Sequence, residues 1–139
     1  MNVKLMERLA EIYAGRPFII DVADIAPAGG EAWNKSGVAR ITIDCRESGQ
    51  HLAYVFCHEL AHHVLNHVRN NDTPPRSTDI DENHMTLAAA GVKADSTGNY
   101  FERRKAYLDR LEREADAWAK KTLGELRQRF PDIDKLLCG

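Results

Sequence analysis

The segment from about Gln50 to Val68 constrains the fold most, because its apolar residues recur with the period of an α-helix. At about 100° per residue they fall on one broad face, which other parts of the chain must cover. We therefore expect a helix that is mostly buried and lies at the centre of the domain. The residues on this face are Leu52, Ala53, Phe56, Cys57, Leu60, Ala61, Val64 and Val68.

The N-terminal part of the chain predicts another helix and then a change to strand-like patterns. Residues Val3–Ala14 have helical spacing, and Gly15 is expected to end that helix. Phe18–Val22 and Gly37–Ile43 are rich in β-branched residues and predict two strands. Pro27–Gly30 predicts a turn between them, and the signal for a further short strand after it is too weak to assign one.

The C-terminal part predicts a long helix over about Tyr100–Leu123 and a short final helix that begins at Pro131. Residues 70–99 are rich in proline, glycine and short polar side chains, and predict a long loop or lid insertion that is mobile without substrate. All 139 residues are expected to form one domain. The predicted fold class is α+β, a mostly helical single domain with a small β-sheet and a central helix packed against the second long helix.

The composition of the chain limits the kinds of partner and the cellular compartment that we expect for it. The formal net charge of -2 argues against direct nucleic acid binding, since such domains usually carry a basic excess. Cys45, Cys57 and Cys138 are odd in number and unrelated in spacing, which indicates reduced thiols rather than disulfides. No stretch approaches the roughly 18 apolar residues of a membrane span. We therefore expect a soluble, cytoplasmic protein.

The central helix carries His58-Glu59-Leu60-Ala61-His62, an H-E-x-x-H motif. Residues four apart project from the same face of a helix, so the two imidazoles can hold one tetrahedral zinc ion. Glu59 lies on the adjoining face, from which its carboxylate can reach a water on the metal. A five-residue match arises in roughly 2 of 100 shuffled sequences of this composition, so its position beside an apolar helix face adds weight.

The chemistry predicted for this motif is hydrolysis of a peptide bond. Zinc lowers the pKa of a bound water from 15.7 to about 7 and polarises a carbonyl group. Glu59 is the predicted catalytic residue, a general base that takes the proton from the water and later delivers it to the leaving amine.

The third protein ligand is expected on the long helix, which carries Glu112 and Glu114. These two residues point to different sides of the helix, and periodicity does not choose between them. Glu112 lies nearer the apolar arc, and with Asp116 it forms an E-x-x-x-D pair similar to that of thermolysin-type enzymes. Small residues nearby would allow this helix to approach the motif helix closely.

The remaining histidines are not expected to bind the metal ion. His63 points away from the motif face and is predicted to be solvated. His67, extrapolated along the helix, falls angularly far from the motif and is predicted to pack near the helix C-terminus. His84 lies in the long loop; together with Tyr100 and Tyr107 it is a conceivable stabiliser of the transition state, and nothing in the sequence ranks the three.

Two motifs together resemble the ImmA/IrrE family of metallopeptidases. His58–His62, followed by Leu65 and His67, resembles that family's H-E-L-x-H-x-x-L-x-H pattern, and Glu114–Ala119 is similar to its E-A-N-x-F-A signature. The resemblance covers roughly residues 50–120. It implies metal ligands His58, His62 and Glu114, with Trp118 as a packed aromatic and Asp116 at a position that the family usually fills with asparagine.

The function that this resemblance implies is the cleavage of a regulatory protein, such as a helix-turn-helix repressor, by a zinc-dependent endopeptidase encoded on a phage or mobile element. The alternative is an antirepressor-like interaction module that retains the metal-binding fold but does not cut its partner. A purely structural zinc site is disfavoured, because such sites usually have four ligands rich in cysteine and Glu59 would have no role.

Overall fold

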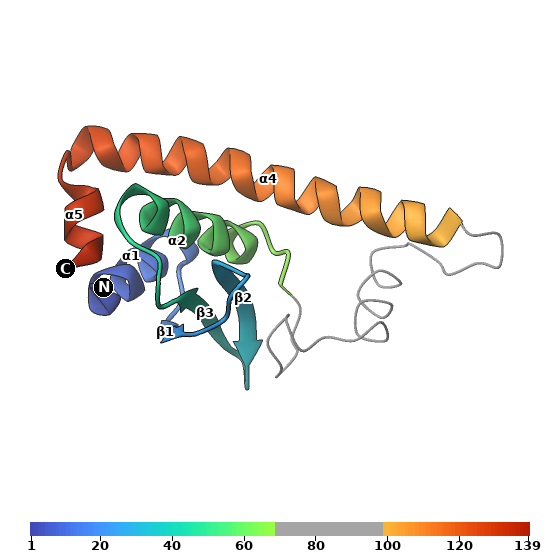
Figure 1. The fold of residues 1–139 in the computed structure, drawn as a ribbon, viewed down its shortest axis with the longest axis horizontal. Helices are drawn as coiled ribbons and strands as arrows, with labels where there is room; N and C mark the ends of the chain where they lie inside the picture. Colours follow the sequence, from blue (N-terminus) through green and yellow to red (C-terminus); the bar gives the residue numbers. More distant parts are fainter. Residues whose placement is uncertain (69–98) are drawn as a thin grey trace.

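The computed structural model describes residues 1–68 and 99–139, except for the side chains of residues 99–101. Figure 1 shows a long helix lying across a smaller assembly of helices and a three-stranded sheet. In chain order the elements are α1 (Val3–Ala14), β1 (Phe18–Ala23), β2 (Gly30–Lys35), β3 (Val38–Asp44), α2 (Gly49–Val64), α4 (Asn99–Arg129) and α5 (Ile133–Cys138).

The sheet has the strand order β1-β3-β2, with β3 in the middle. β1 runs parallel to β3, and β2 runs antiparallel to it. Ile20 of β1 lies beside Ile41 of β3, and both side chains are buried on the face that meets the helices. The β-branched residues of β1 and β3 thus supply one wall of the core.

The helix α2 lies between the sheet and α4 (Figure 1). It packs against α1, α4, α5, β2 and β3, so its apolar face is covered from several directions. A single cluster of buried side chains joins these elements. Its members are Met6, Ala10, Phe18, Ile20, Ala39, Ile41, Ile43, Leu52, Ala53, Phe56, Cys57, Leu60, Ala119, Leu123, Leu126, Ile133 and Leu137.

The predicted α+β fold class is confirmed, and the apolar face predicted for the central helix is buried from Leu52 to Ala61. α2 ends at Val64, four residues before the predicted end. β2 is a strand that the sequence pattern did not assign. The proposed loop or lid at 70–99 lies almost entirely outside the described residues.

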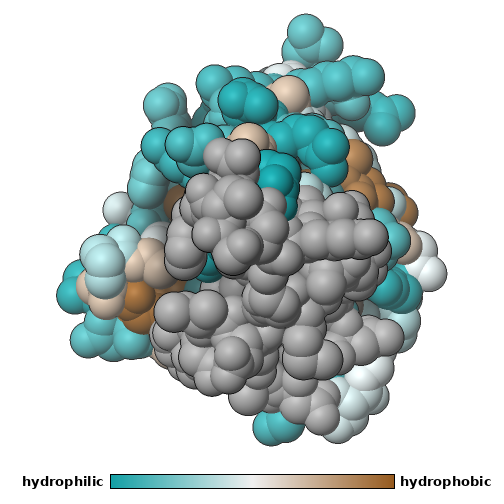
Figure 2. Space-filling model, turned by 90° about the vertical axis from the view of Figure 1, so that its right-hand side faces the viewer, coloured by the Kyte–Doolittle hydropathy of each residue, from teal (hydrophilic) through white to brown (hydrophobic). Residues whose placement is uncertain are grey.

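The described helices include none that is both long and apolar enough to cross a membrane. On the face shown in Figure 2, the described residues are mostly hydrophilic, and hydrophobic residues form small separate groups. The three cysteines are free thiols, as expected; Cys57 is buried in the core, where burial raises its pKa to about 12.

His63 is a core residue, so the prediction that it is solvated was wrong. Its side chain is 3% exposed, and its Nε2–H donates to the carbonyl oxygen of Arg40 on β3 at 2.8 Å. Arg16 donates to Nδ1 at 3.3 Å, and the Phe18 ring packs edge-on at 4.9 Å between centroids. Both ring nitrogens are therefore used by a neutral imidazole, and burial lowers the pKa of His63 to about 4.

Acidification is predicted to destabilise the fold through His63. Its folded pKa lies below the unfolded value of about 6.5, so the unfolded chain binds more protons between those values. The free energy of unfolding should fall by up to about 3 kcal/mol as pH drops from about 6.5 to 4. Denaturant unfolding in the presence of chelator measures this, and His63→Gln should flatten the profile. His51→Gln, an exposed change on the same helix, is the control; parallel profiles for His63→Gln and wild type would contradict the assignment.

Strand β2 approaches α2 so closely that only glycine fits at position 30. A Cβ atom on Gly30 would lie 2.7 Å from Cγ of Glu59 and 2.8 Å from Cγ1 of Val55. Both distances are shorter than van der Waals contact allows, so the strand or the glutamate would have to move. Gly30 therefore sets how near the backbone of β2 comes to the H-E-x-x-H glutamate.

Replacing Gly30 by alanine is predicted to destabilise the protein by roughly 1–3 kcal/mol, the usual cost of overpacking. Gly124→Ala is the matched control, since a Cβ there meets nothing within 4 Å and alanine favours a helix by about 0.5–1 kcal/mol. Adding Val55→Ala to Gly30→Ala should restore part of the loss. Chemical denaturation measures all four proteins, and a neutral Gly30→Ala would show that the strand has room to retreat.

Candidate metal centre

His58 and His62 lie one helical turn apart on α2, and both face Glu112 of α4. His58 Nε2 is 2.9 Å from Glu112 Oε2, and His62 Nε2 is 3.2 Å from Oε1. One ligand atom from each residue falls within 4.8 Å of the other two. Two imidazoles and a carboxylate arranged in this way could hold a metal ion, and this donor set is typical of catalytic zinc sites.

The position of Glu112 follows from the packing of α4 on α2. Ala115 and Ala119 are fully buried, and their small side chains allow the two helices to approach closely. Glu112 precedes Ala115 by three residues and Ala119 by seven, so it shares their face of α4. The helix contact that buries the alanines therefore also brings this carboxylate to the two histidines.

Glu114, the third ligand that the family resemblance implies, does not lie with His58 and His62. Its Oε2 is 2.8 Å from Nε2 of His67, and Arg110 lies 3.8 Å from its other oxygen. The structure thus places Glu112, the alternative that periodicity left open, beside both motif histidines.

His67 lies beside His62, contrary to the expectation from helical angles. The helix has already ended: Asn66 adopts a left-handed backbone with φ of 59°. The amide of His67 donates to the carbonyl of His62 at 2.7 Å, and the amide of Asn66 donates to that of His63 at 3.1 Å. This pair of bonds is the Schellman motif, which turns the chain back over the last helical turn. His67 Nδ1 therefore lies 3.0 Å from His62 Nδ1.

Tyr54 supports the other motif histidine. Its hydroxyl donates to Asp116 of α4 and lies 3.4 Å from His58 Nδ1, so its oxygen can accept the Nδ1 proton. Burial raises the pKa of Tyr54 to about 12, with the Asp116 hydrogen bond as the second cause. The sequence analysis missed Tyr54, although its position four residues before His58 places it on the same helix face.

The contacts of the three histidines require more protons than neutral imidazoles carry. His58 Nε2 and His62 Nε2 face Glu112, His62 Nδ1 faces His67 Nδ1, and His67 Nε2 faces Glu114. Each of these four contacts needs a proton between two lone pairs, and three neutral rings supply three. A cation between Glu112 and the two Nε2 atoms would replace the protons there. The donor set therefore fits a bound divalent metal ion.

Glu59 is half-buried beside this group, against the backbone of β2 at Gly30. Burial raises the pKa of Glu59 to about 7, while the neighbouring His62 and His58 act in the opposite direction. The carboxylate of Glu112 behaves differently, because hydrogen bonds from His58 and His62 hold its pKa well below the usual range. Two glutamates near the same histidines thus have opposite tendencies, one to take up a proton and one to stay ionised.

The remaining predicted residues lie outside this group or outside the described structure. Tyr107 contacts Arg110, whose guanidinium lies 5.3 Å from the centre of the ring. Trp118 is partly buried and packs edge-on against Tyr13, as expected for a packed aromatic. His84 and the side chain of Tyr100 lie outside the described residues.

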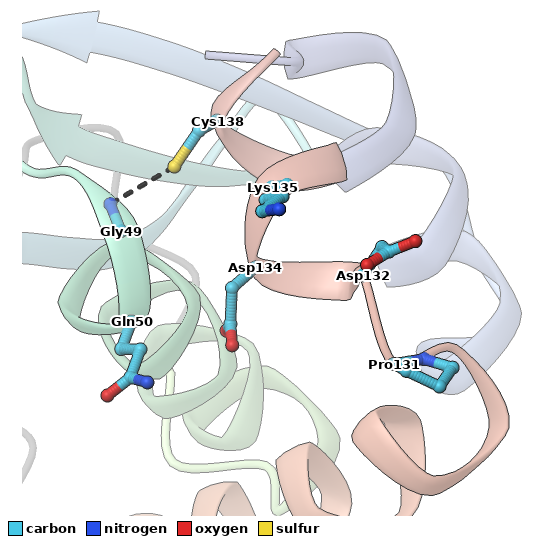
Figure 3. Close-up of a pocket in the computed structure, with 7 residues that line it drawn as sticks. All are labelled: Gly49, Gln50, Pro131, Asp132, Asp134, Lys135 and Cys138. Carbon is cyan, nitrogen blue, oxygen red and sulfur yellow. Dashed lines mark hydrogen bonds between the residues drawn. The ribbon is translucent and has the colours of Figure 1, made fainter.

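An open pocket of about 310 Å³ lies between the start of α2 and α5, at the opposite end of α2 from His62 (Figure 3). Within it, the Gly49 amide donates to Cys138 Sγ at 3.1 Å. The residues that line it are Gly49, Gln50, Pro131, Asp132, Asp134, Lys135 and Cys138. None of them belongs to the metal centre.

The candidate metal centre rests on the positions of His58, His62 and Glu112 in this chain alone. Comparison with protein-family models, with curated proteins and with solved structures found no match. The resemblance of two short motifs to the ImmA/IrrE family therefore stays a prediction.

Proposed function

We propose that this protein is a zinc-dependent endopeptidase in which His58, His62 and Glu112 hold one zinc ion and Glu59 is the general base. The proposal rests on one observation: a ligand atom of Glu112 and one of each H-E-x-x-H histidine lie within 4.8 Å of one another. The half-buried Glu59 lies beside this group. Three protein ligands and an adjacent general base are the composition of a catalytic zinc site rather than of a structural one.

The chain's own residues have distinct tasks in this reaction. A zinc ion held here supplies the acidification of a water molecule and the polarisation of the scissile carbonyl. Glu59 removes a proton from the attacking water and returns it to the leaving amine as the C–N bond breaks. Gly30 lets the backbone of β2 pass close to the Glu59 side chain, which limits the positions that its carboxylate can occupy.

The proposed substrate is a regulatory protein, such as a helix-turn-helix repressor, in the cytoplasm. This part of the proposal is supported by the two family-like motifs, His58–His62 and Glu114–Ala119. The competing proposal is an antirepressor-like module that binds such a partner without cutting it. It needs the same metal-binding group but no hydrolysis, so cleavage of the partner separates the two proposals.

Metal content and cleavage together test the proposed site. Purified wild type should contain about one zinc per chain by elemental analysis. His62→Ala and Glu112→Ala should lose it, because each removes one ligand atom. Glu59→Gln should keep the metal and lower the rate of cleavage by about 10²–10⁴-fold, the usual contribution of a general base.

Cleavage is best followed by incubating the protein with a candidate repressor and resolving the fragments by mass spectrometry. Fragments should disappear with chelator and return with added zinc. Unchanged cleavage by Glu59→Gln would place the base elsewhere. Zinc binding with a stable repressor complex and no fragments would favour the interaction module, and a wild type that takes up no zinc would remove the proposal.

A further inference from the structure

We infer that His67 and Glu114 form an outer arm that fixes the tautomer and the ring orientation of His62. The inference rests on the proposed metal centre and deepens it, since it assigns roles to two residues that are not metal ligands. His67 and Glu114 are positioning residues here, because they act on the metal only through His62.

The arm is a chain of two hydrogen bonds that leads outward from His62. His62 Nδ1 lies 3.0 Å from His67 Nδ1, and His67 Nε2 lies 2.8 Å from Glu114 Oε2. Glu114 accepts only, so His67 must carry its proton on Nε2. The Nδ1 atom of His67 is then an acceptor, and His62 must donate to it from Nδ1.

This direction of donation prepares His62 to bind a metal ion. A neutral imidazole carries one proton, and placing it on Nδ1 leaves the lone pair of Nε2 free. Nε2 is the atom of His62 that faces Glu112, at 3.2 Å from Oε1. Without a metal ion this contact needs a second proton on the His62 ring, and a metal ion bound to the Nε2 lone pair would take the place of that proton. The arm therefore selects the tautomer whose lone pair points into the metal centre.

Burial of His67 stabilises the hydrogen bonds of the arm. The His67 side chain is only 6% exposed, whereas that of Glu114 is 47% exposed. Water has little access to His67, so breaking its bond to His62 would leave a ring nitrogen without a partner. The outer carboxylate stays solvated, and the arm avoids the cost of burying a charge.

The end of α2 places His67 in the arm. Asn66 has a left-handed backbone, with φ of 59°, and this turn brings His67 back to the ring of His62. Asparagine and glycine adopt this conformation readily, whereas a β-branched residue is strained in it. The arm therefore requires a residue that tolerates a left-handed backbone, such as Asn66, directly before His67.

Zinc affinity, measured by competition with a coloured chelator, tests the inference. Outer partners of metal-binding histidines typically change affinity by about 10–100-fold. His67→Phe and Glu114→Ala remove the hydrogen-bonding atoms of the two residues, and each should weaken binding by about that factor. The double variant should be little worse than either single one, because both changes break the same chain. Glu125→Ala removes an exposed carboxylate farther along α4 and should leave the affinity unchanged.

Asn66 offers a matched pair of variants at the turn. Asn66→Gly keeps the left-handed backbone accessible and should retain wild-type affinity for zinc. Asn66→Val should lower the affinity by a factor similar to that of His67→Phe. Thermal unfolding without metal is measured beside each variant; a loss of affinity in Asn66→Val with a folded chain supports the arm, and equal affinities for the two variants overturn it.

Other outcomes separate the arm from the proposed function. Loss of zinc in Glu114→Ala, with affinity kept in Glu112→Ala, would make Glu114 a ligand and overturn the arm. Unchanged affinity in His67→Phe would also overturn it.

A proton resonance tests the arm independently of zinc. The ring N–H of His67 that is bonded to Glu114 should give a downfield resonance with or without zinc. If wild type binds no zinc but shows this resonance, and Glu114→Ala abolishes it, the arm stands and the proposed function fails. A wild type that never shows it overturns the arm.

Discussion

The packing of α4 on α2 is the contact on which the candidate metal centre depends. Ala115 and Ala119 are fully buried in it, and their methyl groups let the helices lie close enough for Glu112 to reach both motif histidines. A larger side chain at either position would push α4 outward and part the carboxylate from the imidazoles. The hydrophobic effect thus stabilises a cluster of polar groups: burial of the alanines and of α2's apolar face offsets the cost of desolvating the site.

Two carboxylates that lie two residues apart on α4 contact different histidines. Glu112 faces the Nε2 atoms of His58 and His62, and Glu114 reaches His67 beyond the end of the helix. Glu112 is held ionised by two imidazoles, so it offers a full negative charge toward the centre. Since neutral imidazoles alone cannot satisfy all the contacts, a divalent cation suits this arrangement better than a set of neutral side chains does.

Periodicity predicted the helices and strands whose apolar residues are regularly spaced. It failed for residues whose position depends on tertiary contacts or on a reversal of the chain. The buried face of α2 was predictable because Leu52–Ala61 repeats with helical spacing and needs cover. Strand β2 (Gly30–Lys35) was not, because it lacks β-branched residues and is held by pairing with β3 and by packing against α2. A helical projection predicted that His63 is solvated. In the structure it fills the space between α2 and β3, where the backbone carbonyl of Arg40 accepts a hydrogen bond from its Nε2.

The choice between Glu112 and Glu114 shows why the site itself was only partly predictable. His58, Glu59 and His62 follow from local spacing, since four residues in a helix bring two side chains to one face. The third ligand depends on how α4 is rotated about its axis, and that rotation is set by which of its small residues are buried. The end of α2 matters as well. The chain reverses direction at Asn66, and His67, which follows the reversal, forms a hydrogen bond with Glu114. A helical projection continued past Asn66 places His67 on the wrong side of the helix. It therefore also misses the contact between His67 and Glu114, which holds Glu114 away from His58 and His62.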